Sequence, residues 1–215
     1  DIIGFGGIIT QYRTIKCAMS LCKKLSPSST VVLGGGIASC APKFMLDRTE
    51  ADVVVIEEGE ATFSELLVRI EKLIPLNGLR GIGYKDSEGS YINQPRTSIE
   101  KGANGLDGIP WPLRSYWPLD DVYSINPVGH LNWEAKWQDG ENRTGKKSLS
   151  ILASRGCPYA KSACHYCYAS YLGERYRLRS PSDVVKEMVF LKERYEVDYI
   201  HFLDDLLMTD WRWVL

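Results

Sequence analysis

Three cysteines in one short segment could do chemistry that no other part of the chain suggests. Cys157, Cys164 and Cys167 stand in the segment RGCPYAKSACHYC, directly after a strand-like run at residues 148–154. Three thiolates bind a soft metal well, whereas a closed tetrahedral zinc site takes four ligands. A [4Fe–4S] cluster held by three cysteines keeps one iron open to a further ligand, unlike the four-cysteine clusters of electron carriers. The spacing favours a reactive cluster of this kind.

Other interpretations of these cysteines stay open at this point. A zinc site could use the three thiolates with His165 or a more distant histidine, although His165 stands between two of the cysteines, which is awkward for a shared metal. The cysteines could also be buried packing residues, because free cysteine is common in cores, but such residues rarely cluster. A disulfide framework fits worse, because the chain is too long and too poor in cysteine.

Composition narrows the class of protein. The chain has 215 residues, enough for one large or two small domains, with 44% hydrophobic and 25% charged residues, as in an ordinary soluble globular protein. A net charge of −1 gives no electrostatic argument for nucleic acid or an anionic membrane. No apolar run reaches the length of about 18 residues that a membrane span needs. Six cysteines without a recognisable secretory signal predict a reducing cytoplasm.

Both ends of the sequence read as interior segments of a fold. The chain opens on DIIGFGGIIT, without an initiator methionine, and closes on the apolar run WRWVL. We therefore expect a longer protein, truncated at both ends here.

The first third of the chain alternates short apolar strands with helical patterns. Strands of this kind joined by helices predict a parallel sheet that is covered on both faces. The expected strands are 1–5, 30–33 and 53–56, and the expected helices are 12–25, 42–47 and about 61–74.

Glycine and other small residues follow each of these strands. In open parallel sheets, ligands bind beyond the carboxyl ends of the strands, and glycine lets a backbone approach a bulky ligand closely. The alternative is that the glycines only form tight strand–helix turns. Neither a G-x-G-x-x-G motif nor a P-loop is present, which argues against nucleotide binding. The strand-end residues are Gly4, Gly6, Gly7 and Thr10, then Gly34, Gly35, Gly36 and Ser39, then Gly59, Glu60 and Thr62.

The alternation of strands and helices stops in the middle of the chain. Residues 79–92 predict a β-hairpin that turns through DSEG. Residues 100–147 are rich in Pro, Trp, Gly and Asn and lack a sustained period, which predicts an irregular segment between domains. We interpret the tryptophans of this segment as packing residues.

A strand–helix–strand pattern returns in the last third. The strand at 148–154 leads into the cysteine segment, Ser182 opens a helix that runs through Arg194, and a second strand covers 199–203. This order is that of the first units of a β/α barrel. The expected apolar face of the helix consists of Val184, Val185, Met188 and Leu191.

Taken together, these motifs resemble the cobalamin-binding radical SAM enzymes, and the resemblance covers nearly the whole chain. VVLGGGIAS and ADVVVIEEGEATFSELL are similar to the ligand-facing strand ends of that family's cobalamin domain. LDGIPWPLR resembles its connecting segment and RGCPYAKSACHYC its cluster loop. RSPSDVVKEM and IHFLDDLLMTD resemble the first helix and second strand of its barrel.

The chain departs from the family pattern in three places. The cysteines follow C-x6-C-x2-C where C-x3-C-x2-C is usual, an enlargement also found in some peptide-maturing relatives. The family's GEGE motif appears as Glu57-Glu58-Gly59-Glu60, and Gly36-Ile37 stands where a histidine often follows the glycine pair. No D-x-H-x-x-G motif supplies a lower-axial histidine, and this branch of the family commonly does without one.

The resemblance implies three cofactors, namely a [4Fe–4S] cluster, S-adenosylmethionine (SAM) and cobalamin. It implies that Cys157, Cys164 and Cys167 bind the cluster. It also implies SAM contacts from Tyr166, Asp204 and Asp205, of which the two aspartates could equally form a solvent-facing strand end. The cobalamin contacts that it implies are Gly6, Thr10, Gly34, Gly35, Gly36, Ser39, Gly59 and Glu60.

The expected fold is α/β, with a partial Rossmann-like cobalamin-binding domain at 1–99, an interdomain linker at 100–147, and the start of a radical SAM partial (β/α) barrel at 148–215. The resemblance implies SAM cleavage to a 5′-deoxyadenosyl radical, for methyl transfer to an unactivated carbon or for rearrangement or cyclisation of the substrate. A small-molecule or peptide substrate and an electron donor such as flavodoxin or ferredoxin are the expected partners. A radical SAM enzyme without cobalamin, and a non-catalytic zinc or iron–sulfur module, remain as alternatives.

Overall fold

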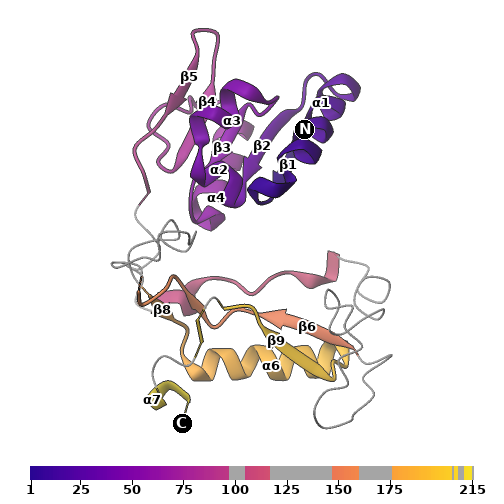
Figure 1. Ribbon diagram of the computed structural model, residues 1–215, viewed down its shortest axis with the longest axis vertical. Helices are drawn as coiled ribbons and strands as arrows, with labels where there is room; N and C mark the ends of the chain where they lie inside the picture. The colour runs from indigo at the N-terminus through magenta and orange to yellow at the C-terminus, as the bar shows by residue number, and fades with distance from the viewer. Residues whose placement is uncertain (97–104, 117–146, 160–175, 205, 208–210, 215) are drawn as a thin grey trace. The chain divides into compact units, whose positions relative to one another are not determined.

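The computed structural model describes residues 1–96, 105–116, 147–159, 176–204, 206–207 and 211–214 (Figure 1). Contacts divide the chain into two compact units, of which the first holds residues 1–96 and the second holds the described residues from 105 onward. No helix among the described residues is long and apolar enough to cross a membrane.

The first unit is built on a five-stranded sheet in the order β1-β2-β3-β4-β5. The first three strands are parallel, and the last two form an antiparallel hairpin at the edge beside β3. Strands β1 and β2 end together, because Gly6 pairs with Gly34, so their carboxyl ends lie at one edge of the sheet. The strands are β1 (Ile2–Gly6), β2 (Thr30–Gly34), β3 (Val53–Val55), β4 (Ile82–Lys85) and β5 (Ser90–Ile92).

Helices cover both faces of this sheet, as the apolar strands predict. Side chains alternate across β2, so Val31 and Leu33 lie in one apolar cluster and Val32 lies in the other. The first cluster contains residues of α1, α2 and α3, and the second contains Leu66 of α4. The helices are α1 (Tyr12–Leu25), α2 (Gly35–Cys40), α3 (Pro42–Arg48) and α4 (Gly59–Glu71), with a 3-10 turn η1 (Ile9–Gln11) before α1.

The second unit pairs β6 (Ser148–Ile151) with β9 (Tyr199–Phe202) in parallel, and the chain between them contains α6 (Pro181–Tyr195) (Figure 1). This is the strand–helix–strand order that the sequence predicts. Short pieces complete the described part: η2 (Gly105–Gly108), η3 (Arg114–Tyr116), β7 (Ser154–Arg155), β8 (Arg177–Leu178) and α7 (Trp211–Val214).

Helix α6 begins where its capping residues place it. Ser180 accepts a hydrogen bond from the Asp183 N–H through its side chain, and Pro181 occupies the first turn. Val184 and Leu191 are buried, but Val185 is 55% exposed, so the prediction that it shares their face is wrong. The charged Glu187 is buried instead, at 1% exposure, which apolar periodicity does not reveal.

Described residues of the expected linker pack onto the second unit. The Asp107 carboxylate accepts a hydrogen bond from the Ser180 N–H at 2.7 Å. The Trp111 ring lies 5.7 Å from that of Phe190 on α6, which agrees with a packing role for this tryptophan. Arg114 donates to the Glu187 carboxylate at 3.0 Å and to the Ser150 carbonyl at 2.7 Å.

Candidate functional site

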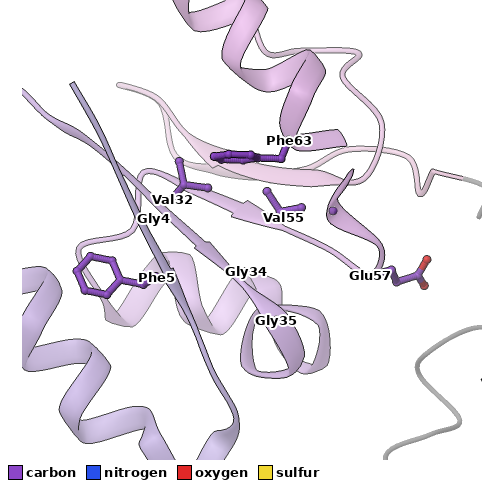
Figure 2. A pocket seen from close by; sticks show the side chains of 9 residues that line it. Gly4, Phe5, Val32, Gly34, Gly35, Val55, Glu57 and Phe63 are labelled. Atoms are coloured by element: carbon purple, nitrogen blue, oxygen red, sulfur yellow. The ribbon is translucent and has the colours of Figure 1, made fainter. Parts of the chain in front are cut away.

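A pocket of about 260 Å³ opens in the first unit, toward the carboxyl ends of its parallel strands (Figure 2). Figure 2 shows Val32 and Val55 on the same side of their strands as the ring of Phe63, while glycines leave the backbone bare beside them. The lining residues come from β1, β2, β3 and the start of α4. They are Gly4, Phe5, Val32, Gly34, Gly35, Val55, Glu57, Gly59 and Phe63.

Gly35 is required by the fold itself. Its φ is +77°, and a Cβ at this position would lie 3.1 Å from both the N and the O of Gly7. The loops after β1 and β2 therefore touch here, and the Ile37 N–H donates a hydrogen bond to the Gly7 carbonyl at 3.0 Å. Only glycine meets both demands without strain. The tight-turn interpretation of the glycine pattern thus applies at Gly35.

The other lining glycines are not needed for a turn. A Cβ on Gly4 would meet no atom within 4 Å, and one on Gly34 would lie 4.0 Å from the Phe5 carbonyl. A Cβ on Gly59 would make an ordinary contact with Val55 at 3.6 Å. A Cβ at any of these three positions would not disturb the described fold. Their bareness creates the space in the pocket, which is what close approach of a bulky ligand requires.

Ser39 joins the loops that follow β2 and β3. Its hydroxyl accepts a hydrogen bond from the Glu57 N–H at 2.8 Å and lies 3.2 Å from the Gly35 carbonyl, to which it donates. Glu57 has a φ of 63°, in the left-handed region that non-glycine residues seldom adopt. Ser39 therefore holds an unusual backbone conformation at the rim of the pocket, although it is not itself a lining residue.

The predicted cobalamin contacts divide into two groups. Gly34, Gly35 and Gly59 line the pocket. The remaining five do not: Gly6 is exposed at the end of β1, Thr10 is exposed in η1, Gly36 lies in α2, Ser39 lies beside the rim, and Glu60 is exposed in the first turn of α4. A contact between any of these residues and cobalamin stays a prediction.

Sequence reasoning did not select the apolar walls of the pocket. Val32, Val55 and Phe63 read as ordinary core residues, because nothing in their type separates a pocket wall from a packed interior. The signal that could have identified these walls is the pairing of residues on neighbouring strands. Gly4 pairs with Val32 across β1 and β2, so a bare position lies next to an apolar side chain on the neighbouring strand.

Most of the predicted cluster and SAM site lies outside the described residues, namely Cys164, Tyr166, Cys167 and Asp205, together with His165 of the zinc alternative. Cys157 is described, and it is a half-buried free thiol two residues after β7. Among the residues that the structure describes, no three His, Cys, Asp or Glu side chains gather to hold a metal. The three-cysteine site therefore stays a prediction.

Asp204 has a definite role at the end of β9. Its carboxylate accepts hydrogen bonds from the Ala153 N–H at 3.1 Å, from the Ser154 N–H at 2.5 Å and from the Ser154 hydroxyl. These bonds fix the start of β7, three residues before Cys157. The carboxylate thus anchors the start of the cysteine segment, and its predicted contact with SAM stays a prediction.

A second charged network supports the same strand end. Arg179 donates to the Leu152 carbonyl at 2.8 Å and to the Glu187 carboxylate at 2.6 Å. Burial lowers the pKa of Arg179, but the hydrogen bonds that it donates to Glu187 and Asp183 outweigh this effect and raise that pKa above its ordinary value. Arg179 therefore stays charged, and Glu187 lies between Arg179 and Arg114.

Comparison with known proteins agrees with this geometry. Residues 1–67, which contain the whole pocket lining, match the B12 binding domain family. A cytidylyl-2-hydroxyethylphosphonate methyltransferase of Streptomyces wedmorensis is 25% identical over 98% of this chain and 40% of its own length. An anaerobic magnesium-protoporphyrin IX monomethyl ester cyclase of Synechocystis is 27% identical over 95% of this chain and 36% of its own length.

Solved structures share the fold. The cobalamin-dependent S-adenosylmethionine radical enzyme OxsB, in a structure with aqua-cobalamin and S-adenosylmethionine bound, aligns with a TM-score of 0.66 at 21% identity. The alignment covers 95% of this chain and 25% of that one. The predicted fold class and the resemblance to cobalamin-binding radical SAM enzymes are confirmed, while the chain spans 40% or less of the length of the relatives named here.

Proposed function

Because a B12-binding domain is joined here to the fold of the cobalamin-dependent radical SAM enzymes, we propose that this chain binds cobalamin in residues 1–99 and a [4Fe–4S] cluster with SAM in residues 148–215. The whole protein would transfer a methyl group to an unactivated carbon of a small molecule or peptide. Ring formation is the second candidate, since one relative is a cyclase. The proposed setting is the cytoplasm, with a flavodoxin or ferredoxin as electron donor and residues 100–147 as the connection between domains.

The single observation that carries the cobalamin assignment is the bare backbone of the pocket. A volume of about 260 Å³ is slightly below the range of about 300–1,000 Å³ for small-ligand pockets, so it would take one part of a cobalamin molecule. Gly4, Gly34 and Gly59 would face that part through their backbones, and Val32, Val55 and Phe63 would give it an apolar wall. These residues fit a bulky ligand with a flat apolar portion.

The donor set at Cys157, Cys164 and Cys167 fits a cluster with one open iron, as three soft thiolates and no fourth cysteine in their segment predict. When bound, the cluster would supply the electron that cleaves SAM, and cobalamin would supply a carrier for the methyl group. The chain's own part is to orient them and exclude competing reactions. Asp204 would fix the strand end that leads to Cys157, and Glu187 with its two arginines would hold that strand against α6.

Gly4→Val tests the pocket. Valine favours a strand, and its Cβ would meet no atom within 4 Å, so the unfolding midpoint should stay or rise while hydroxocobalamin binding falls at least tenfold. Titration followed by absorbance gives the affinity. Ser90→Val is the control, since it places the same side chain in strand β5 of the same sheet, outside the pocket lining and outside the predicted cobalamin contacts. Equal binding by wild type and Gly4→Val would refute the assignment of this pocket.

Cysteine variants test the cluster. After anaerobic reconstitution, Cys157→Ala should lose iron and sulfide, because one of three thiolates is removed. Cys17→Ala is the control, since Cys17 is an exposed residue of α1. Loss of iron in Cys17→Ala with retention in Cys157→Ala would contradict the assignment, and a colourless zinc protein would favour a non-catalytic module.

A further inference from the structure

Glu57 has a left-handed backbone conformation that does not terminate a helix. Two other described non-glycine residues have a positive φ, Leu73 at 52° and Glu196 at 55°. Both stand at the C-terminal ends of helices, where a left-handed residue commonly satisfies the last carbonyls. Glu57 instead precedes a helix, because Glu58 is the N-cap of α4. Helix termination therefore does not explain its conformation.

Local contacts hold this conformation but do not require a glutamate. The Glu57 N–H donates to Ser39, a bond that any residue except proline could make, and glycine would adopt the same φ without strain. The Glu57 side chain is exposed, and its carboxylate has no hydrogen bond or ion pair within the described part of the chain. Strained residues of this kind gather at ligand sites, where the surroundings fix them.

The side chain lies where a ligand would emerge from the pocket. Glu57 lines the pocket, and Figure 2 shows its carboxylate at the outer rim, pointing away from the ring of Phe63. A ligand larger than about 260 Å³ must continue past this rim. A carboxylate accepts hydrogen bonds only, so it selects a ligand with N–H or O–H groups at that point.

We propose that Glu57 is a recognition residue whose carboxylate accepts a hydrogen bond from a primary amide on the ligand that fills the pocket. The inference rests on the proposed function, because cobalamin carries primary amide side chains around its corrin edge. Hydrogen bonds to an ionised acceptor are stronger than neutral ones, so the bond formed on binding would offset the strain that the free protein retains. Glu57 thereby adds selectivity to a pocket whose other lining residues are apolar or glycine.

Three variants separate recognition from structure. Glu57→Gly removes the carboxylate and the strain together, so hydroxocobalamin affinity should fall about five- to tenfold while the unfolding midpoint stays or rises. Glu57→Gln keeps the strain and one oxygen acceptor but loses the charge, so its affinity should lie between those of wild type and Glu57→Gly. Leu73→Gly is the matched control, since it relieves a left-handed residue in the same unit outside the pocket and should leave binding unchanged.

The outcomes distinguish this inference from the proposed function. Wild-type protein that does not bind hydroxocobalamin would refute the proposed function. Wild type and Glu57→Gly binding equally well would refute the recognition role while leaving the pocket assignment intact. A fall in both the affinity and the unfolding midpoint of Glu57→Gly would show that the residue serves the fold, and would also overturn the proposal.

Discussion

The two units of the chain are stabilised in different ways. No charged residue is buried among the described residues of the first unit, where apolar clusters pack against both faces of a sheet. The second unit has one apolar cluster and, beside it, Arg114 and Glu187 in buried positions. Apolar packing distributes stability over many contacts, whereas a buried ion network concentrates it in a few groups that cannot be removed singly.

The largest expected effect is that of Glu187→Ala, which breaks the concentrated network. It leaves the buried Arg114 and the neighbouring Arg179 without their shared carboxylate, and removing one member of a buried ion pair costs about 3–5 kcal/mol. Hydrogen exchange along α6, together with denaturant unfolding, measures the loss. Glu193→Ala on the same helix is the control, because Glu193 is exposed. If both variants lose the same small amount, the contrast between the units disappears.

Leu33→Ala makes the corresponding test of the first unit. Leu33 is fully buried in β2, and truncating a buried leucine costs about 2–5 kcal/mol. Exchange protection should fall in β2 and α1 and be retained in α6. Leu25→Ala, at the exposed end of α1, should change little. An equal fall in α6 would mean that the two units unfold together, and the comparison would have to be abandoned.

Acid should weaken the first unit through Glu65. A hydrogen bond from Arg96 is the main cause that lowers the pKa of Glu65 below its ordinary value of 4.5, against the opposing effect of burial. A depressed pKa stabilises the folded state above pH 4.5, and this contribution is lost as the pH falls through the folded-state pKa. Glu65→Gln should therefore flatten the decline of the unfolding midpoint below pH 5. An unchanged slope would show that the ion pair does not contribute to stability.

The smallest effect is expected at an exposed ion pair. Lys43 and Asp47 lie 3.0 Å apart on α3 with side chains 64% and 42% exposed. Exposed pairs of this kind contribute little, because water screens the charges. Asp47→Ala should leave the unfolding midpoint unchanged within error. A loss comparable to that of Glu187→Ala would mean that burial is not what separates the two kinds of ion pair.

The sequence predicts most of the regular elements because their cause is local. The apolar spacing of α1 and the β-branched runs of β2 and β3 mark these elements well. Helix α2 was not predicted, since six residues that begin with two glycines carry no helical period, and β7 and β8 have two residues each. The placement of Glu187 could not be foreseen, because its partner Arg114 lies 73 residues away in the sequence.

In the candidate site, too, residues placed by local sequence or topology were predicted, and residues placed by distant contacts were not. Gly34, Gly35 and Gly59 were predicted from their position after strands, a rule of topology that needs no contacts. Val32 and Val55 were not, because pocket walls and core share residue types. The left-handed backbone of Glu57 was not predicted either, since glutamate seldom adopts it and the hydrogen bond from its N–H to Ser39 spans 18 positions of sequence.

The open space at Gly4 has a consequence for how such a protein can change over generations. Most substitutions in a protein are limited first by their cost to stability. A Cβ at Gly4 meets no described atom within 4 Å, so a small side chain there would cost the described fold little. On the proposed function, ligand binding is the requirement that favours glycine at this position. A lineage that no longer needed the ligand could therefore fill the pocket and keep its fold, which makes loss of the cofactor an easy evolutionary step.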